Sequence, residues 1–483
     1  MRNLTRFAVA AAVTTTLAAC AVGPDYHQPT TQTAPAFAAT DAIYTSAEPD
    51  VGAFWTRFDD ATLDRLVGDA LQSNHDLRIA LANLRQARAL RMQARLDLAP
   101  TVTAQGGYTH QQYPPAEAFG SSTALDQRYY SAGFDATWEL DFFGRVRRGV
   151  EAARAEVGES EATLRDAQVS VTAEVARTYF ELRGTQSELA VTQRNVENQQ
   201  QTLALADSLL AAGRGTELDT ARAQAQLQTT LGAIPPLQAA IARSIHRLSV
   251  LTGRQPEALQ AALVTPGDLP DLPRLTAVGD PAGLLRRRPD IRIAERRLAA
   301  STARIGVAVG DLFPKVTFDG NFGYAAGSLG ALGAGNTRTF LIGPSISWAA
   351  FDLGRVQARI QGAHAQTDAD LARYQQTVLN ALEETENALV THARSRDRLE
   401  HLQQAAQQSA AAAGIARARY EGGLVGFIDV LDAERTELSA EDQLAQSRTD
   451  TATSLIAVYK ALGGGWQGAN LPLPVAPPLA EAR

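Results

Sequence analysis

The stretch YSAGFDATWELD, from Tyr130 to Asp141, alternates between apolar and polar side chains throughout its length. A period of two, with one apolar and one polar face, predicts a β-strand. Three further runs show the same alternation, at residues 101–109, 316–324 and 340–348. The runs have about nine to twelve residues, the length with which a tilted strand crosses a bilayer. Two soluble hairpins packed on a core are the alternative.

Aromatic side chains gather around these runs. Residues 101–143 and 313–351 together hold 16 of the 30 aromatic residues in the chain. Trp138 and Trp348 belong to this set, and tryptophan is typical of the interface between lipid and water. The aromatic enrichment, the length of the runs and the lipid anchor described next favour membrane strands over soluble hairpins.

The N-terminal residues have the organisation of an export signal. Arg2 and Arg6 precede the short apolar run FAVAAAV, and LAAC follows, ending at Cys20. This predicts a signal peptide over residues 1–19. LAAC resembles the bacterial lipobox, which implies a mature chain that begins at Cys20 with an N-acyl group (palmitate) and diacylglycerol. Two or more acyl chains anchor a protein stably. A signal peptide with an incidental cysteine is the alternative.

Two further details concern the membrane. Ala21 follows Cys20, in place of the aspartate that retains lipoproteins at the inner membrane. No later stretch has ~18 consecutive apolar residues, so the sequence predicts no spanning helix. Strands with open edges in lipid leave backbone groups unpaired at several kcal/mol each, so they must close with strands of other copies. Two, three or four chains would give eight, twelve or sixteen strands, and only the larger two closures leave a lumen.

The chain contains an internal repeat. Asp76 aligns with Asp290 at an offset of 214 residues, and Gly144 aligns with Gly354 at an offset of 210. The second offset also aligns Asp219 with Asp429. The change in offset therefore falls within the strand segment, where loops accept insertions and deletions.

The rest of each repeat is predicted to be helical. Apolar residues recur every seven positions from Val175 to Leu210, which indicates a coiled coil. About 70 residues of helix would extend about 100 Å, so the turns after the long helices should lie far from the strands. Shorter helices are predicted near 62–98 and 289–311. The predicted parts are a lipidated segment 20–60; a first repeat 61–252 with hairpin 101–141, long helix 144–212 and helix 216–252; a linker 253–288; a second repeat 289–465 with hairpin 314–351, long helix 354–421 and helix 425–462; and a Pro-rich tail 466–483.

The stretch YEGGLVGFIDVLDAER, from Tyr420 to Arg435, interrupts the second helical region with glycines. Glycine favours the ends of helices, so we expect chain-reversing turns at the tips of two helical hairpins. The glycines concerned are Gly213, Gly215, Gly422 and Gly423. Asp429 and Asp432 follow on one helix face. A purely structural explanation is that an acidic side chain stabilises the N-terminus of the following helix by ~0.3–1 kcal/mol.

Composition and motifs argue against several function classes. The chain has 45 basic and 52 acidic residues and a net charge of −7, which argues against a nucleic-acid partner. Its seven histidines form no metal-binding motif, and there is no nucleophile–base pattern. We therefore expect neither an enzyme nor a metal or cofactor site beyond the lipid on Cys20.

Three separated segments carry a family resemblance. LLRRRPDIRIAERRLAA (Leu284–Ala300), GVAVGDLFPKV (Gly306–Val316) and the glycine-containing segment above resemble the TolC-like outer-membrane efflux channels (outer membrane factor family), in their lipoprotein OprM/NodT-type branch. The resemblance covers roughly the entire mature chain. It implies a mixed α and β membrane protein: a homotrimer with four strands per chain in one twelve-stranded barrel, and antiparallel coiled-coil helices forming a periplasmic α-barrel.

The resemblance also implies a gate. In that family a pair of aspartates at the closed tip faces the pore, and Asp429 and Asp432 match that pair. Tyr420 matches a tyrosine that helps to hold the tip shut, and Asp219 matches an aspartate that joins such contacts. Val425 stands where some members have an arginine that ties helices together. Three chains would bring six carboxylates to one axis, where they raise each other's pKa and attract cations.

The function expected from this resemblance is passive export. The chain would be the outer-membrane, lipid-anchored component of a tripartite efflux system that extends into the periplasm. A periplasmic adaptor protein and an inner-membrane pump of the RND type would deliver drugs or other small toxic compounds. Type I protein secretion and metal-ion export are alternatives, and an envelope scaffold is a third that would not require four membrane-length strands.

Overall fold

The computed structural model describes residues 21–39, 41–113, 125–273 and 276–467. The expected signal peptide, Cys20 and residues 468–483 of the expected tail lie outside these ranges. The chain divides into two compact units. The first contains the described residues up to Thr30, Asn83–Glu161 and Ile293–Gln375, and the second contains Thr31–Ala82, Ala162–Arg292 and the residues from Gln376 onward.

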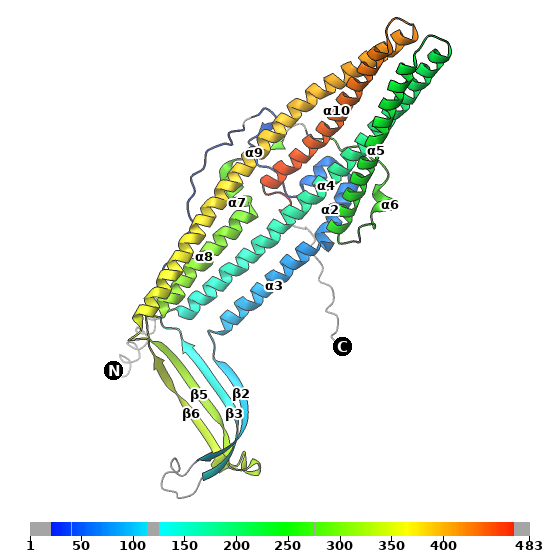
Figure 1. Ribbon diagram of the computed structural model, residues 1–483. Helices are drawn as coiled ribbons and strands as arrows, with labels where there is room; N and C mark the ends of the chain where they lie inside the picture. The colour runs from blue at the N-terminus through cyan, green and yellow to red at the C-terminus, as the bar shows by residue number, and fades with distance from the viewer. Residues whose placement is uncertain (1–20, 40, 114–124, 274–275, 468–483) are drawn as a thin grey trace. The chain divides into compact units, whose positions relative to one another are not determined.

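The first unit contains a four-stranded antiparallel sheet with strand order β2-β3-β5-β6 (Figure 1). Its strands are β2 (Thr101–Tyr113), β3 (Leu125–Leu140), β5 (Lys315–Ala326) and β6 (Arg338–Ser347). Two short 3-10 helices, η2 (Leu329–Ala331) and η3 (Gly335–Thr337), connect β5 to β6. Each hairpin predicted from alternation therefore contributes two neighbouring strands.

The register of the sheet separates apolar from polar side chains. One row across all four strands consists of Ala104, Phe134, Phe322 and Phe340. The adjacent row on the other face consists of Thr103, Asp135, Asn321 and Leu341, where the Asn321 amide donates to the Asp135 carboxylate. The three phenylalanines of the first row are exposed, at 58%, 50% and 69%. The sheet therefore presents one apolar face that the described part of the chain leaves exposed.

Four helices belong partly to this unit: α3 (His75–Leu96), α4 (Arg145–Ala211), α8 (Pro289–Gly310) and α9 (Leu353–Glu421). Arg297 on α8 forms an ion pair with Glu159 on α4 at 2.6 Å. The N-terminal segment also docks here, because the Tyr26 hydroxyl donates to Glu295 at 2.6 Å and Val22 N donates to Phe143 O at 3.0 Å.

The second unit is helical and holds the main hydrophobic core. It contains η1 (Phe54–Phe58), α2 (Ala61–Ser73), α5 (Glu217–Leu251), α6 (Gln260–Leu263), α7 (Pro281–Arg287) and α10 (Phe427–Ala461), with a two-stranded parallel sheet of β1 (Tyr44–Thr45) and β4 (Thr276–Ala277). Phe54 stacks on Tyr459 at 5.0 Å between ring centroids, and Phe58 meets Phe180 edge-on at 4.9 Å. These aromatic contacts join η1 to α4 and α10.

The coiled-coil positions of α4 lie at the centre of this packing. Val175 and Leu182 are fully buried, and Val196 is buried as well. α4 and α5 form one hairpin, and α9 and α10 form another (Figure 1). Among the residues that the structure describes, none of the helices is both long enough and apolar enough to cross a membrane.

The prediction of a single helix over residues 62–98 is wrong, because the structure has two helices there, α2 and α3. Asn74 between them has an extended backbone, with φ −62° and ψ 133°. Its side-chain oxygen accepts the N–H groups of Asp76 and Leu77 at 2.8 and 3.2 Å, and its amide donates to Leu251 O at 2.9 Å. An asparagine that caps the following helix in this way ends the preceding one.

Candidate functional site

The two glycine-containing turns have the same geometry. Gly213 and Gly423 have φ values of +70° and +72°, in the left-handed region that glycine adopts without strain. In each turn the glycine N–H and the next N–H donate to carbonyls of the last helical turn at 2.8–2.9 Å, which is a Schellman motif. A Cβ atom on Gly215 would lie 2.8 Å from Leu210 N, whereas Gly422 has room for one. Three of the four predicted turn glycines are therefore sterically required.

Asp219 and Asp429 each accept hydrogen bonds at the N-terminus of the helix to which they belong. The Asp219 carboxylate accepts hydrogen bonds from the N–H and hydroxyl of Thr216, at 3.3 and 2.7 Å, in a capping box. The Asp429 carboxylate accepts the N–H of Gly426 at 3.0 Å. Each acid thus satisfies a free donor at a helix N-terminus. For Asp429, this contact agrees with the alternative explanation that the acid stabilises the start of the helix.

Asp432 differs from these two acids. It lies one turn further along α10 and is exposed. Its carboxylate forms no hydrogen bond or ion pair with any residue in the described part of the chain. Nothing in the described part of the chain pairs with this carboxylate, so Asp432 is the stronger candidate for a pore-facing carboxylate.

Tyr420 lies in a small apolar cluster at the tip. Its ring meets Phe427 at 5.5 Å between centroids, and Val425 packs against the edge of the same cluster. Its hydroxyl is buried and has no hydrogen-bond partner within the described residues. Burial raises the pKa of Tyr420, and the negative charge of Asp219 raises it further. The structure therefore brings Tyr420 and Asp219 near each other without joining them by a hydrogen bond.

An ion-pair cluster that the sequence motifs do not predict lies beside this tyrosine. Arg417 on α9 donates to Glu434 at 2.8 Å and to Glu437 at 3.0 Å, both on α10. Thr202 on α4 donates to the same oxygen of Glu434 at 2.6 Å. The one signal available in the sequence is that a basic residue precedes the turn and two acidic residues follow it.

The two predicted interface tryptophans make equivalent contacts in the first unit. The Trp138 indole N–H donates to Leu98 O, and the Trp348 indole N–H donates to Leu312 O, both at 3.0 Å. Each carbonyl lies in the turn between a helix and the first strand of a hairpin. Both tryptophans therefore brace helix–strand junctions, and both remain partly exposed, at 37% and 54%.

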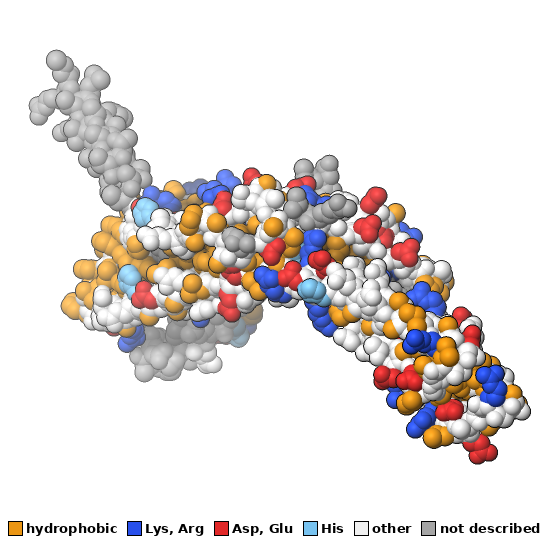
Figure 2. All heavy atoms as spheres, turned by 90° about the horizontal axis from the view of Figure 1, so that it is seen from above, with side chains coloured by type: hydrophobic (Ala, Val, Ile, Leu, Met, Phe, Trp, Pro, Cys, Tyr) orange, Lys and Arg blue, Asp and Glu red, His pale blue; other side chains and the backbone are white. Residues whose placement is uncertain are grey.

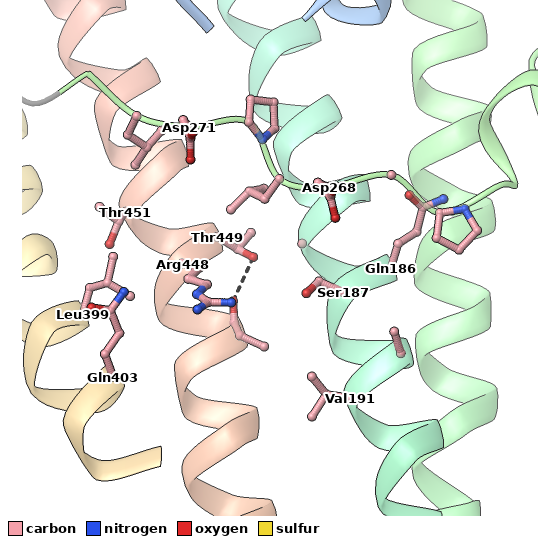
Figure 3. Close-up of a pocket in the computed structure, with 18 of the residues that line it drawn as sticks. Gln186, Ser187, Val191, Asp268, Asp271, Leu399, Gln403, Arg448, Thr449 and Thr451 are labelled. Carbon is pink, nitrogen blue, oxygen red and sulfur yellow. Dashed lines mark hydrogen bonds between the residues drawn. The ribbon is translucent and has the colours of Figure 1, made fainter. Parts of the chain in front are cut away.

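A separate cavity of about 730 Å³ lies in the second unit, between α4, α9, α10 and the linker that includes Pro266–Leu272. Asp268 and Asp271 extend from the linker toward it, and Arg448 extends from α10 (Figure 3). None of the predicted gate residues lines this cavity. Within the described ranges, no group of three or more histidine, cysteine or carboxylate side chains is placed to hold a metal ion.

The visible surface is mixed in charge. Figure 2 shows basic and acidic side chains interspersed over the face in view, with no extended patch of one sign. A nucleic-acid binder presents a basic patch or stripe, which this face lacks.

The chain contains the same arrangement twice: a hairpin of alternating strands, a long helix, and a helical tip that turns at glycines. This arrangement is typical of a class of membrane-export protein. The chain belongs to the outer membrane efflux protein family, whose model matches residues 66–254 and 281–464. This confirms the family resemblance, the mixed α and β fold class, the outer-membrane location and the role in efflux.

Individual relatives agree with this assignment. The chain is 32% identical over 458 residues to outer membrane protein OprJ of Pseudomonas aeruginosa, covering 93% of this chain and 94% of the relative. It is 30% identical to the toluene efflux pump outer membrane protein TtgC of Pseudomonas putida, covering 93% of each. The solved structure of the outer-membrane channel OprN is similar with a TM-score of 0.88 and 44% identity, covering 93% of this chain and all of that one.

Proposed function

We propose that this chain is one subunit of a homotrimeric duct in the bacterial outer membrane. The duct passively exports drugs or other small toxic compounds and has no catalytic role. A periplasmic adaptor protein and an inner-membrane pump of the RND type deliver these compounds. The family match and the similarity to TtgC, the outer membrane protein of a toluene efflux pump, support this cargo class.

The observation that carries the proposal is the four-stranded sheet. β2 and β6 are its outer strands, and each is paired on one side only within the described chain. Unpaired backbone groups in lipid cost several kcal/mol each, so the free edges must pair with neighbouring copies. Three copies of four strands would close into one cylinder of twelve, with the apolar face toward lipid and the polar face toward a lumen.

The docked N-terminal segment supports lipidation of Cys20. Arg148 donates to Val22 O at 3.1 Å, to Gly23 O at 3.2 Å and to the Asp25 carboxylate at 2.8 Å. A Cβ atom on Gly144 would lie 2.6 Å from the Cα atom of Ala21. These contacts hold the residues after Cys20 against the junction of β3 and α4, so acyl chains on Cys20 would enter lipid beside the sheet.

Asp432 and Asp429 are proposed to form the pore-facing ring at the tip. Both are exposed in the single chain and lie on adjacent turns of α10. Tyr420 and Asp219 are proposed to support the closed tip from the neighbouring turns. Crowded carboxylates attract cations, which is a common selectivity device in channels.

The function is tested by deleting the gene and measuring the susceptibility of the strain to a panel of antibiotics and organic solvents. We expect susceptibility to increase and to return to the original level when the full-length chain is supplied again. A strain whose susceptibility to every compound is unaltered would contradict the proposed cargo class. Protein secretion and metal-ion export are not favoured.

A further inference from the structure

Two arginines lie at equivalent positions near one end of the four-stranded sheet. Arg128 lies near the start of β3, and Arg338 is the first residue of β6. They are the only arginines in the described strands of this sheet, and the offset of 210 residues between the repeats aligns one with the other. The same offset aligns Trp138 with Trp348. Each hairpin therefore has a tryptophan ten residues after an arginine.

The arginine and the tryptophan of each hairpin belong to the apolar face of the sheet. The register of β3 with β2 and β5 runs without a bulge, so side chains an even number of residues apart share a face. Arg128 and Trp138 thus share the face of the exposed phenylalanines. Arg338 shares this face too, because it lies two residues before the phenylalanine of β6. Trp348 directly follows β6, and its indole N–H donates to a turn carbonyl as that of Trp138 does.

The distance between each arginine and its tryptophan matches the thickness of a membrane. Ten strand residues extend about 33 Å, and a strand tilted by about 40° crosses about 25 Å of depth. This is the height of the apolar band on an outer-membrane barrel. On the described strands β3 and β6, no charged side chain interrupts this stretch of the apolar face, whose residues are Tyr130, Ala132, Phe134, Ala136, Phe340, Ile342, Pro344 and Ile346.

The register indicates that the two arginines lie at the same depth. Across β5, the position opposite Arg338 on β3 lies four residues after Arg128. Likewise, the position opposite Trp138 on β6 lies four residues before Trp348. Strands of a barrel are tilted and staggered, so residues at one depth on neighbouring strands are offset along the ladder. The identical stagger of both pairs therefore places the tryptophans at one border of the apolar band and the arginines at the other.

The guanidinium groups of both arginines are available to a ligand. Arg128 and Arg338 are exposed, and neither side chain forms a hydrogen bond or ion pair within the described part of the chain. The nearest charged neighbours on this face are His110 and Asp126, which contact each other. A guanidinium presents a planar fork of N–H donors that matches the oxygens of a phosphate group.

We propose that Arg128 and Arg338 bind the phosphate groups of anionic lipid headgroups at the outer surface of the membrane. α3, α4, α8 and α9 all join the sheet at its other end (Figure 1), so the arginines lie on the side away from the periplasm. A lipid fits this position because its acyl chains would cover the apolar band while its phosphate meets the guanidinium. The inference rests on the proposed function, which places the sheet in the outer membrane.

The test measures the binding of phosphatidic acid, a lipid with a phosphate monoester, to the purified full-length protein in neutral detergent by native mass spectrometry. We expect the original protein to prefer phosphatidic acid over phosphatidylcholine with the same acyl chains. Arg128→Gln combined with Arg338→Gln should weaken the binding of phosphatidic acid about fivefold per site, equivalent to about 1 kcal/mol. Binding of phosphatidylcholine should stay unaltered. A double variant that binds phosphatidic acid as tightly as the original protein would overturn the site.

Arg85→Gln is the matched control. Arg85 is an exposed arginine of α3 in the same unit, well before β2, so its substitution removes the same charge away from the sheet. It should leave the binding of phosphatidic acid unaltered, and a loss equal to that of the double variant would reject the site in favour of nonspecific attraction.

Inorganic phosphate distinguishes a lipid from a free anion. An excess of inorganic phosphate should leave most of the phosphatidic acid bound, because the acyl chains contribute contacts that the free ion lacks. Complete displacement by inorganic phosphate would assign the arginines to a free anion and overturn the lipid site.

Two further outcomes are separable. If the double variant does not fold, the two single variants are measured instead, and original affinity in both would reject the site. If the original chain does not restore resistance to the deletion strain, the proposed duct fails. If it does restore resistance and the double variant binds phosphatidic acid like the original protein, the lipid site alone fails.

Discussion

Gly184 on α4 faces Thr449 on α10 so closely that a Cβ atom at position 184 would lie 1.9 Å from Thr449 Oγ1. The same Cβ atom would lie 2.7 Å from Thr449 Cγ2 and 2.8 Å from Thr449 Cβ. The contact involves the base of the threonine side chain, which cannot move away without moving its helix. The absence of a side chain at Gly184 therefore sets the separation of the two helices.

Gly184→Ala is expected to lower the free energy of unfolding by about 1–3 kcal/mol, the cost of overpacking a close contact. Gly232, within α5, has no atom within 4 Å of an added Cβ. Gly232→Ala should instead stabilise the chain by about 0.5–1 kcal/mol through helix propensity. Thermal unfolding of both variants in detergent distinguishes them, and equal effects would contradict the close-contact explanation.

Arg288→Met is expected to destabilise the second unit by about 2–3 kcal/mol, because it leaves two carboxylates without their cation. Arg288 donates to Asp290 at 2.8 Å, to Glu384 at 2.6 Å and to Ala461 O at 2.8 Å. The expected cost is below that of a fully buried pair because Glu384 is 44% exposed. The exposed Arg286 provides the control, and Arg286→Met should leave the unfolding temperature within error of the original.

The alternation of apolar and polar residues predicts where the strands lie but not how far they extend. β3 begins at Leu125, whereas the apolar and polar alternation begins at Tyr130. The extra residues are mainly polar and pair with the similarly polar end of β2, for example His110 with Arg128. Backbone hydrogen bonds extend a strand pair whatever its side chains are. Apolar–polar alternation therefore marks only the part of a strand that has one face in an apolar and the other in a polar environment.

The candidate site was predictable where local rules apply. Asp219 follows Thr216 at the spacing of a capping box, and the positive φ of Gly213 follows from its place after a helix. The bonds of Arg417 with Glu434 depend on the rotation of α9 and α10 about their axes. That rotation is set by the packing of both hairpins, which no local pattern encodes.

The ring of Tyr420, rather than its hydroxyl, is expected to support the tip. The hydroxyl is buried without a partner in the described chain, so Tyr420→Phe removes an unsatisfied polar group. We expect Tyr420→Phe to match the original protein in stability and conductance. Tyr420→Ala should lose about 3–5 kcal/mol, the cost of deleting a large side chain from a packed site. A gain in conductance with Tyr420→Phe would show that the hydroxyl bonds a neighbouring copy.

Asp432 is expected to contribute more to ion selectivity than Asp429. Asp432→Asn should reduce the preference of the channel for cations, since its carboxylate forms no hydrogen bond or ion pair with the described residues of its own chain and is free to face the pore. Asp429→Asn should also lower stability slightly, by ~0.5–1 kcal/mol, because it weakens the bond to Gly426 N. Asp219→Asn weakens the capping box with Thr216 and removes a charge that is proposed to support the closed tip, while it leaves Asp429 and Asp432 intact. Conductance and reversal potential measure selectivity, and unaltered values in an Asp429→Ala, Asp432→Ala double variant would remove the gate assignment.

His392 makes the second unit sensitive to acid. Its ring is 1% exposed, and Nδ1 lies 2.9 Å from the Tyr44 hydroxyl. Burial lowers the pKa of His392 from its ordinary 6.5 to about 4; the positive charge of Arg396 lowers it as well, and Asp41 opposes this. The folded chain therefore keeps this imidazole neutral at a pH where the unfolded chain has already protonated it.

This difference predicts how stability depends on pH. Between pH 6.5 and 4 the unfolded state binds a proton that the folded state does not, so the free energy of unfolding falls as the pH falls through this window. The full loss at His392 is about 3 kcal/mol and is absent above pH 6.5. His392→Gln should remove this part of the acid sensitivity, whereas His364→Gln, at an exposed position of α9, should retain it. Unfolding curves of the three proteins at pH 7, 5.5 and 4.5 measure the effect, and parallel losses in all three would show that other groups cause the acid sensitivity.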